Sequence, residues 1–126
     1  MSRVRSQFVV FSPRLNSEML TLHLPWKVLE TLSPTFKESD HFVTVFDLGT
    51  GEHERVDRHL EAAKDAVLAQ HRELYALVGD DCHYTLMVYY EFPTGDVSFN
   101  LVSPIQAAFA FLRIQVVFHL RATSNA

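Results

Sequence analysis

The stretch SPIQAAFAFLRIQVVFHLR, residues 103–121, predicts a helix followed directly by a β-strand. Ser103 can cap the helix, Pro104 suits its first position, and Gln106 completes a capping box. The body of the helix is small and apolar, as expected for a helix pressed closely onto a sheet. The apolar residues of the strand alternate in steps of two, and they are Ile114, Val116, Phe118 and Leu120. The stretch therefore predicts a helix and a strand that share one core.

The segment before this stretch has the composition of a β-hairpin. Residues 83–92 (HYTLMVYYEF) and 97–101 (VSFNL) are typical of strands, and residues 93–96 (PTGD) between them favour a turn. If the even-numbered residues of the first strand face the helices, its odd-numbered residues face the opposite side of the sheet. Those outward residues are Thr85, Met87 and Tyr89.

Two more strands and a long helix are predicted in the first two thirds of the chain. Residues 7–11 (QFVVF) form a short apolar run typical of a buried strand, and residues 41–48 (HFVTVFDL) predict another strand. Residues 55–78 repeat apolar side chains at steps of three and four, which predicts one helix ended by Gly79.

Two segments leave alternatives. Residues 16–24 favour a short helix capped by Asn16 or Ser17. The competing prediction is a strand, because leucines alternate at Leu20, Leu22 and Leu24. Residues 25–40 predict an irregular segment or a short edge strand.

The order of these elements defines a fold class. Strands alternate with helices but include a tight hairpin, which favours antiparallel neighbours. We therefore expect an α+β fold, as a two-layer sandwich with a mostly antiparallel sheet and the helices packed on one face. A chain of 126 residues suits a single domain, residues 1–126.

The composition limits the classes of function. Hydrophobic residues make up 48% of the chain and charged residues 21%, as in ordinary globular proteins. Eleven basic and 15 acidic side chains give a net charge of −4, which disfavours nucleic-acid binding. The single cysteine, Cys82, excludes an intramolecular disulfide and suits a reducing compartment. No segment predicts a signal peptide or a membrane span, so we expect a cytoplasmic protein with no membrane partner.

Three segments resemble a family of small, functionally uncharacterised bacterial α+β domains. They are SPRLNSEMLTLHLP near the start, VDRHLEAAKDAV in the long helix, and DVSFNLVSPIQAAFAFLRIQVVFHL near the end. The resemblance covers most of the chain and consists mainly of hydrophobic spacing. The tryptophan that the family carries before its long helix is missing here, and Trp26 comes much earlier. The resemblance brings no chemistry, but domains of this type include immunity partners of bacterial toxins, which implies a protein partner.

The seven histidines do not have the spacing of a metal site. On the predicted long helix, His53, His59 and His71 form no i, i+4 pair, and His71 is expected at the edge of the core. Residues 80–83 (DDCH) place ligand types in a row, but neighbouring residues of a turn point in different directions. No nucleophile motif surrounds Cys82. We expect no enzyme, catalytic residue, metal or cofactor; the alternative is a small-molecule- or metal-binding enzyme domain that uses residues 80–83.

The strongest functional signal is the sheet face turned away from the helices. It is less polar than a solvated face normally is, and patches of this type mark partner surfaces. We expect a partner-binding site there, made of Met87, Tyr89, Val117, His119, Arg113 and Arg121. The partner would be another protein, such as a toxin, or a second copy of the chain in a homodimer. The alternatives are an ordinary solvated face or one covered by the N-terminal segment.

A second charged surface is predicted on the long helix. Asp57, Glu61 and Asp65 share one side of this helix, and Glu52 and Glu54 precede it. Such a surface can steer a basic partner, and it is also what a soluble helix ordinarily presents to water.

Overall fold

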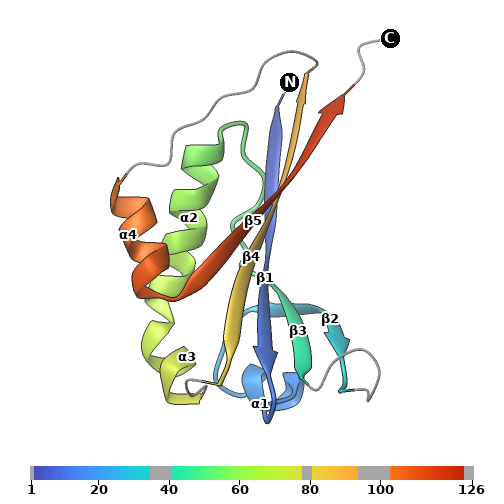
Figure 1. The fold of residues 1–126 in the computed structure, drawn as a ribbon, viewed down its shortest axis with the longest axis vertical. Coiled ribbons are helices and arrows are strands. Elements are labelled where there is room, and N and C mark those ends of the chain that lie inside the picture. The colour runs from blue at the N-terminus through green and yellow to red at the C-terminus, as the bar shows by residue number, and fades with distance from the viewer. Residues whose placement is uncertain (1, 35–40, 78–80, 94–102, 124–126) are drawn as a thin grey trace.

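The computed structural model describes residues 2–34, 41–77, 81–93 and 103–123 (Figure 1). Within these residues the chain forms five strands and four helices. In chain order they are β1 (Arg3–Ser12), α1 (Ser17–Thr21), β2 (Lys27–Leu32), β3 (Phe42–Asp47), α2 (Val56–Ala69), α3 (His71–Leu77), β4 (His83–Pro93), α4 (Ser103–Phe111) and β5 (Ile114–Thr123). The predicted α+β class is confirmed.

The strands form one mixed sheet in the order β2-β3-β1-β4-β5. β1 lies in the middle and pairs antiparallel with β3 and with β4, and β2 pairs antiparallel with β3. β4 and β5 are parallel, which requires a crossover connection, and α4 lies in that connection. Figure 1 shows α2 and α4 side by side on one side of the sheet.

The short elements near the start settle one alternative. α1 is capped by Asn16, whose side chain accepts a hydrogen bond from the backbone N–H of Met19 at 3.0 Å. The helix prediction for residues 16–24 is therefore confirmed and the strand alternative is wrong. β2 is an edge strand, as one of the two predictions for residues 25–40 has it. The strand predicted at residues 97–101 lies outside the described residues.

The single long helix predicted over residues 55–78 is wrong, because the structure breaks it at Gln70. That residue has φ −113° and ψ 9°, outside the helical region, and α3 begins directly after it. The ring nitrogen Nδ1 of His71 lies 2.9 Å from the carbonyl oxygen of Leu68, and a proton on that nitrogen satisfies a carbonyl at the end of α2. None of the described helices is long and apolar enough to cross a membrane.

The core lies between the helices and the even-numbered residues of the central strands. Phe8 of β1 is fully buried, and its ring lies 5.4 Å from that of Trp26 and 5.9 Å from that of Tyr84. Helices contribute fully buried side chains at Leu60, Ala63, Leu74 and Ile105. The apolar side chains that alternate along the strands and those that repeat every 3.6 residues along α2 therefore pack in one cluster.

One polar atom in this core has no partner. The hydroxyl of Tyr84 is buried and makes no hydrogen bond within the described part of the chain, and burial raises the pKa of this phenol. We expect Tyr84→Phe to raise the free energy of unfolding by about 1 kcal/mol, because the substitution removes an unsatisfied donor and keeps the ring. Urea denaturation measures the change. The matched control is Tyr75→Phe, whose hydroxyl donates to the carbonyl of Phe111 at 3.3 Å and should not gain stability. A loss of stability in Tyr84→Phe would contradict the prediction.

Candidate functional site

The sheet has a second face, which the odd-numbered residues of β1, β3, β4 and β5 form and which we call the open face. Val9 of this face is only 7% exposed but does not belong to the core cluster that the helices cover. Several other apolar side chains on the face are half-buried: Phe11, Val43, Val45, Met87 and Val117. The open face therefore presents apolar side chains from four neighbouring strands.

Strand register brings most of the predicted patch together on this face. The parallel pairing of β4 with β5 sets Met87 beside Val117 and Tyr89 beside His119. Arg121 follows on the same face, opposite Glu91. Five of the six predicted patch residues thus lie within one region of two adjacent strands.

A stack of three side chains crosses the open face from β1 to β5. The rings of Tyr89 and His119 are stacked with their centres 5.0 Å apart and 16° between their planes. The guanidinium carbon of Arg5 lies 4.4 Å from the centre of the Tyr89 ring, in cation–π contact. Arg5 was not among the predicted patch residues, because nothing in the sequence indicates that β1 lies directly beside β4.

The charge at this end of the open face is mainly positive. Arg3 pairs with Glu91 at 3.2 Å, but no described carboxylate lies within ion-pair distance of Arg5 or of Arg121. His119 is exposed as well. A shallow pocket of about 180 Å³ lies among Arg5, Tyr89, Tyr90, Glu91, His119, Leu120 and Arg121.

The structure does not bring Arg113 to this patch. Arg113 has φ 57° in the turn between α4 and β5, an unusual conformation for a residue other than glycine. The positive charge of Arg113 opposes the rise in the pKa of the Tyr75 and Tyr84 phenols, so Arg113 lies near these rings. The Tyr84 ring belongs to the core on the helix side. The positive φ turns the chain just before β5, so the alternation of the strand does not extend to Arg113.

The loop proposed as an alternative enzyme site, residues 80–83, is held by structural contacts. Asp80 lies outside the described residues. Asp81 accepts hydrogen bonds from Nε and Nη2 of Arg14 at 2.9 and 3.1 Å, and this contact lowers the pKa of its carboxyl group. Cys82 is buried, which raises the pKa of its thiol. No group of three or more metal-ligating side chains gathers anywhere in the described ranges.

A buried polar group lies on the other side of the sheet, where α2 begins. His53 precedes the helix and His59 lies in its first turns, with Nδ1 of each ring 2.9 Å from Nδ1 of the other. Nε2 of His59 is 2.6 Å from Oγ of Ser6 on β1. His53 and His59 form no i, i+4 pair, as the sequence indicates, but their rings still meet because the loop before α2 folds back onto β1.

Burial decides the protonation state of His59. His59 is 0% exposed, and desolvation, helped by the neighbouring His53, lowers its pKa to about 4. His59 is therefore neutral at physiological pH. Two histidines six residues apart around a helix start were the only sequence signal for this contact, and that spacing alone does not specify one.

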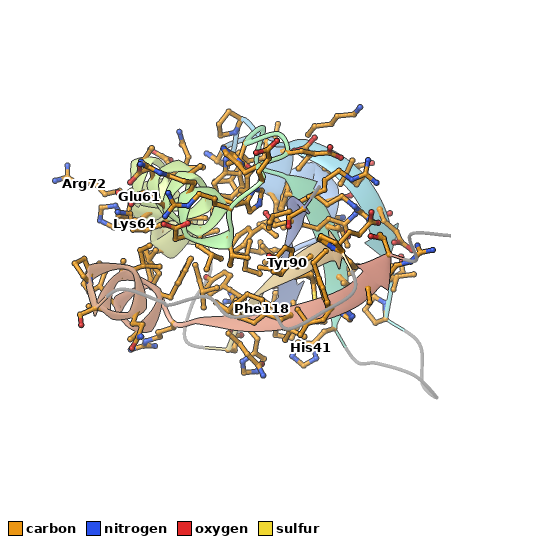
Figure 2. All side chains as sticks on the ribbon, turned by 90° about the horizontal axis from the view of Figure 1, so that it is seen from above. His41, Glu61, Lys64, Arg72, Tyr90 and Phe118 are labelled. Atoms are coloured by element: carbon orange, nitrogen blue, oxygen red, sulfur yellow. The ribbon has the colours of Figure 1, made fainter. Side chains whose placement is uncertain are left out.

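The predicted acidic surface of the long helix is partly neutralised. Lys64 lies 3.6 Å from Glu61 and 3.3 Å from Asp65, and Arg55 lies 2.7 Å from Asp57. Figure 2 shows Glu61 and Lys64 on the outer side of α2, away from Tyr90 and Phe118 in the sheet. These ion pairs, in two of which the largely buried Lys64 takes part, weaken the field that would steer a basic partner to this side.

The element order and the sheet topology place the chain among α+β proteins with one mixed sheet and helices beside it. Comparison with known proteins adds no relative: no family model, no curated protein and no solved structure matches the chain. The function is therefore inferred from the open face and from the group of Ser6, His53 and His59.

Proposed function

We propose that the chain is a protein-binding module that holds an acidic partner on the open face of its sheet. In this proposal the protein is a two-layer sandwich with a mostly antiparallel sheet, and only one of the two sheet faces carries helices. The observation that carries the proposal is the open face with its apolar centre and its stacked Arg5, Tyr89 and His119.

The residue types on this face support a protein partner. Tyrosine, methionine and arginine are enriched at protein interfaces, and aromatic and arginine side chains contribute most of the binding free energy there. Tyr89 is held between Arg5 and His119, so it is already ordered before a partner arrives. Binding then costs less side-chain entropy than it would with a free tyrosine.

The charge of the face indicates the chemistry of the partner. No described carboxylate forms an ion pair with Arg5 or Arg121. A partner surface with aspartate or glutamate beside an apolar centre would supply an ion-pair partner to each arginine. A bacterial toxin neutralised by direct binding is the partner that the sequence resemblance suggests, and a toxin with an acidic contact surface fits this chemistry.

We expect Tyr89→Glu to weaken binding of the partner by at least about 30-fold, because it places a carboxylate at the centre of the contact. The partner is first isolated on immobilised wild-type protein and purified, and the dissociation constant is then measured by calorimetry. Circular dichroism confirms that the variant is folded.

A matched pair of charge reversals locates the surface. Arg121→Glu on the open face should weaken binding, whereas Arg72→Glu on α3 makes the same change on the opposite side and should leave the affinity unchanged. Equal effects of the two reversals would contradict the assignment of the open face.

The identity of the bound molecule tests the charge argument. A partner with an acidic contact surface supports the proposal. If the open face instead binds a second copy of the chain, sedimentation will show a wild-type dimer that Tyr89→Glu dissociates, and the proposal of an acidic partner is then wrong. Capture of no partner by wild-type protein would also count against it.

A further inference from the structure

The group of Ser6, His59 and His53 has the arrangement of an activated nucleophile. Oγ of Ser6 is 2.6 Å from Nε2 of His59, and Nδ1 of His59 is 2.9 Å from Nδ1 of His53. A nucleophile within hydrogen-bond reach of a base, with the base oriented by a third group, is the general pattern of covalent catalysis.

The two hydrogen bonds allow one consistent proton arrangement for such a role. The Ser6 hydroxyl can donate to Nε2 of His59 only when His59 carries its proton on Nδ1. That proton then points at Nδ1 of His53, which accepts it as a neutral imidazole. His53 thereby fixes both the tautomer and the orientation of the His59 ring.

Secondary structure holds all three side chains. His53 is tied to β1 by two backbone hydrogen bonds with Val4, of 2.7 and 3.0 Å, two residues from Ser6. His59 lies in the first turns of α2 and is fully buried. Groups on strands and helices keep their geometry better than groups on free loops.

Ser6 also borders a pocket. The pairing of β1 with β3 ends at Phe8, which pairs with Phe46, and Val4 pairs with His53. Ser6 lies between Phe8 and Val4 on β1, so it faces the loop between Phe46 and His53. An open pocket of about 390 Å³ lies there, and half-buried Ser6 lines it together with Arg5, Gln7, Leu29, Asp47 and residues 49–52. Arg5, Gln7 and Asp47 belong to the open face, so the pocket lies at the gap between β1 and this loop. A ligand in this pocket would therefore lie beside the serine.

The backbone adds a donor on the same side. In a strand every second backbone N–H points to the same edge, and the N–H of Val4 points to His53. The N–H of Ser6 consequently points to the same edge of β1, toward the loop of residues 49–51. A backbone N–H at the nucleophile itself is a common component of an oxyanion hole.

We infer that Ser6 and His59 form a nucleophile–base pair for acyl transfer, with a small ester in the neighbouring pocket as the class of substrate. His53 is a positioning residue. The pocket borders the open face at Arg5, but Ser6 and His59 do not belong to that face, so Tyr89→Glu and Arg121→Glu test the first proposal and His59→Gln tests this one.

The reaction balances with water as the second substrate. Oγ of Ser6 forms a bond to the ester carbonyl carbon while its proton moves to Nε2 of His59, and the carbonyl electron pair goes to oxygen near the Ser6 N–H. The bond to the leaving alcohol breaks, and His59 returns the proton to that oxygen. A water molecule then attacks the acyl group in the same way, which releases the acid and restores the Ser6 hydroxyl.

The lowered pKa makes His59 a weaker base than an ordinary histidine, and it also predicts the pH profile of the reaction. Since the pKa of His59 is lowered to about 4, the imidazole is a free base throughout the neutral range. The reactivity of Ser6 should therefore fall only when the pH approaches 4, well below the value expected for an unperturbed histidine.

The test is covalent labelling of the full chain with diisopropyl fluorophosphate, followed by peptide mapping. We expect Ser6 to react about 100-fold faster than Ser17, which begins α1 and is half-buried like Ser6 but has no imidazole within hydrogen-bond distance among the described residues. His59→Gln should abolish the labelling, and urea-unfolded protein should show no preference for Ser6. The comparison of two serines within the folded wild-type chain does not depend on how well a variant folds, and His59→Gln is read only after circular dichroism shows that it is folded.

The role of His53 has its own readout. His53→Ala should slow the labelling of Ser6 about 10-fold and shift its pH profile, while His53→Asn, which keeps a side-chain acceptor, should restore part of the rate. A purely structural role would not produce that difference between variants of equal stability. Equal labelling of Ser6 and Ser17 in the folded wild-type chain, or labelling of Ser6 that survives in folded His59→Gln, would overturn the inference.

Discussion

Phe8→Ala should lower the free energy of unfolding by about 3–5 kcal/mol, the largest single-residue effect that we expect in this protein. Phe8 is fully buried at the centre of β1 and its ring contacts those of Trp26 and Tyr84. The substitution loses the transfer free energy of the ring and leaves a cavity that the central strand cannot close. Since small domains are stable by only about 5–15 kcal/mol, much of the fold's stability would be lost.

Urea denaturation of wild-type protein and variant measures this effect. The matched control is Phe11→Ala, the same change on the same strand but on the open face, where the ring is only half-buried. The control should cost clearly less. Equal losses in the two variants would mean that the helix side of β1 is not the main core.

Acid should destabilise the fold through His59, which is the second large effect. In the folded protein burial lowers the pKa of His59 to about 4, whereas an unfolded chain titrates near the ordinary value of about 6.5. Between these two values the unfolded state binds more protons than the folded state. The free energy of unfolding therefore falls as the pH falls, by roughly 2 kcal/mol from pH 7 to pH 5 for this one residue.

The difference between variants isolates this contribution. His59→Gln removes the titrating group, so its stability should fall less steeply between pH 7 and pH 5 than that of the wild-type protein. His119→Gln, which changes an exposed histidine, should keep the steep wild-type dependence. Parallel pH profiles for wild type and His59→Gln would contradict the buried neutral state of His59.

Much of the fold follows from local patterns. Asn16 caps α1 as predicted, and α4 begins at Ser103, the residue that the sequence predicts as its cap. The alternation in β4 and β5 separates core residues from open-face residues. The same alternation places Met87, Tyr89, Val117, His119 and Arg121 on one face, because a side chain in a strand must point to one side or the other.

Other features depend on contacts that no local pattern encodes. Gln70 divides a helix that the apolar period predicts as continuous, and the His71 ring lies against the Leu68 carbonyl at this break. Arg113 leaves the patch because of one backbone angle. Arg5 joins it only because β1 lies between β3 and β4 in the sheet.

The sequence by itself determined the α+β class, the helix starts and the direction of each strand side chain, since these follow from capping, periodicity and steric alternation over a few residues. Only the tertiary structure decided which strands are neighbours and which side chains meet across them. Ser6 and His59 are 53 residues apart, and their contact exists because the loop at His53 pairs with β1 and sets α2 above it. Long-range pairing of this kind depends on the summed packing of the whole core, which no short stretch of sequence contains.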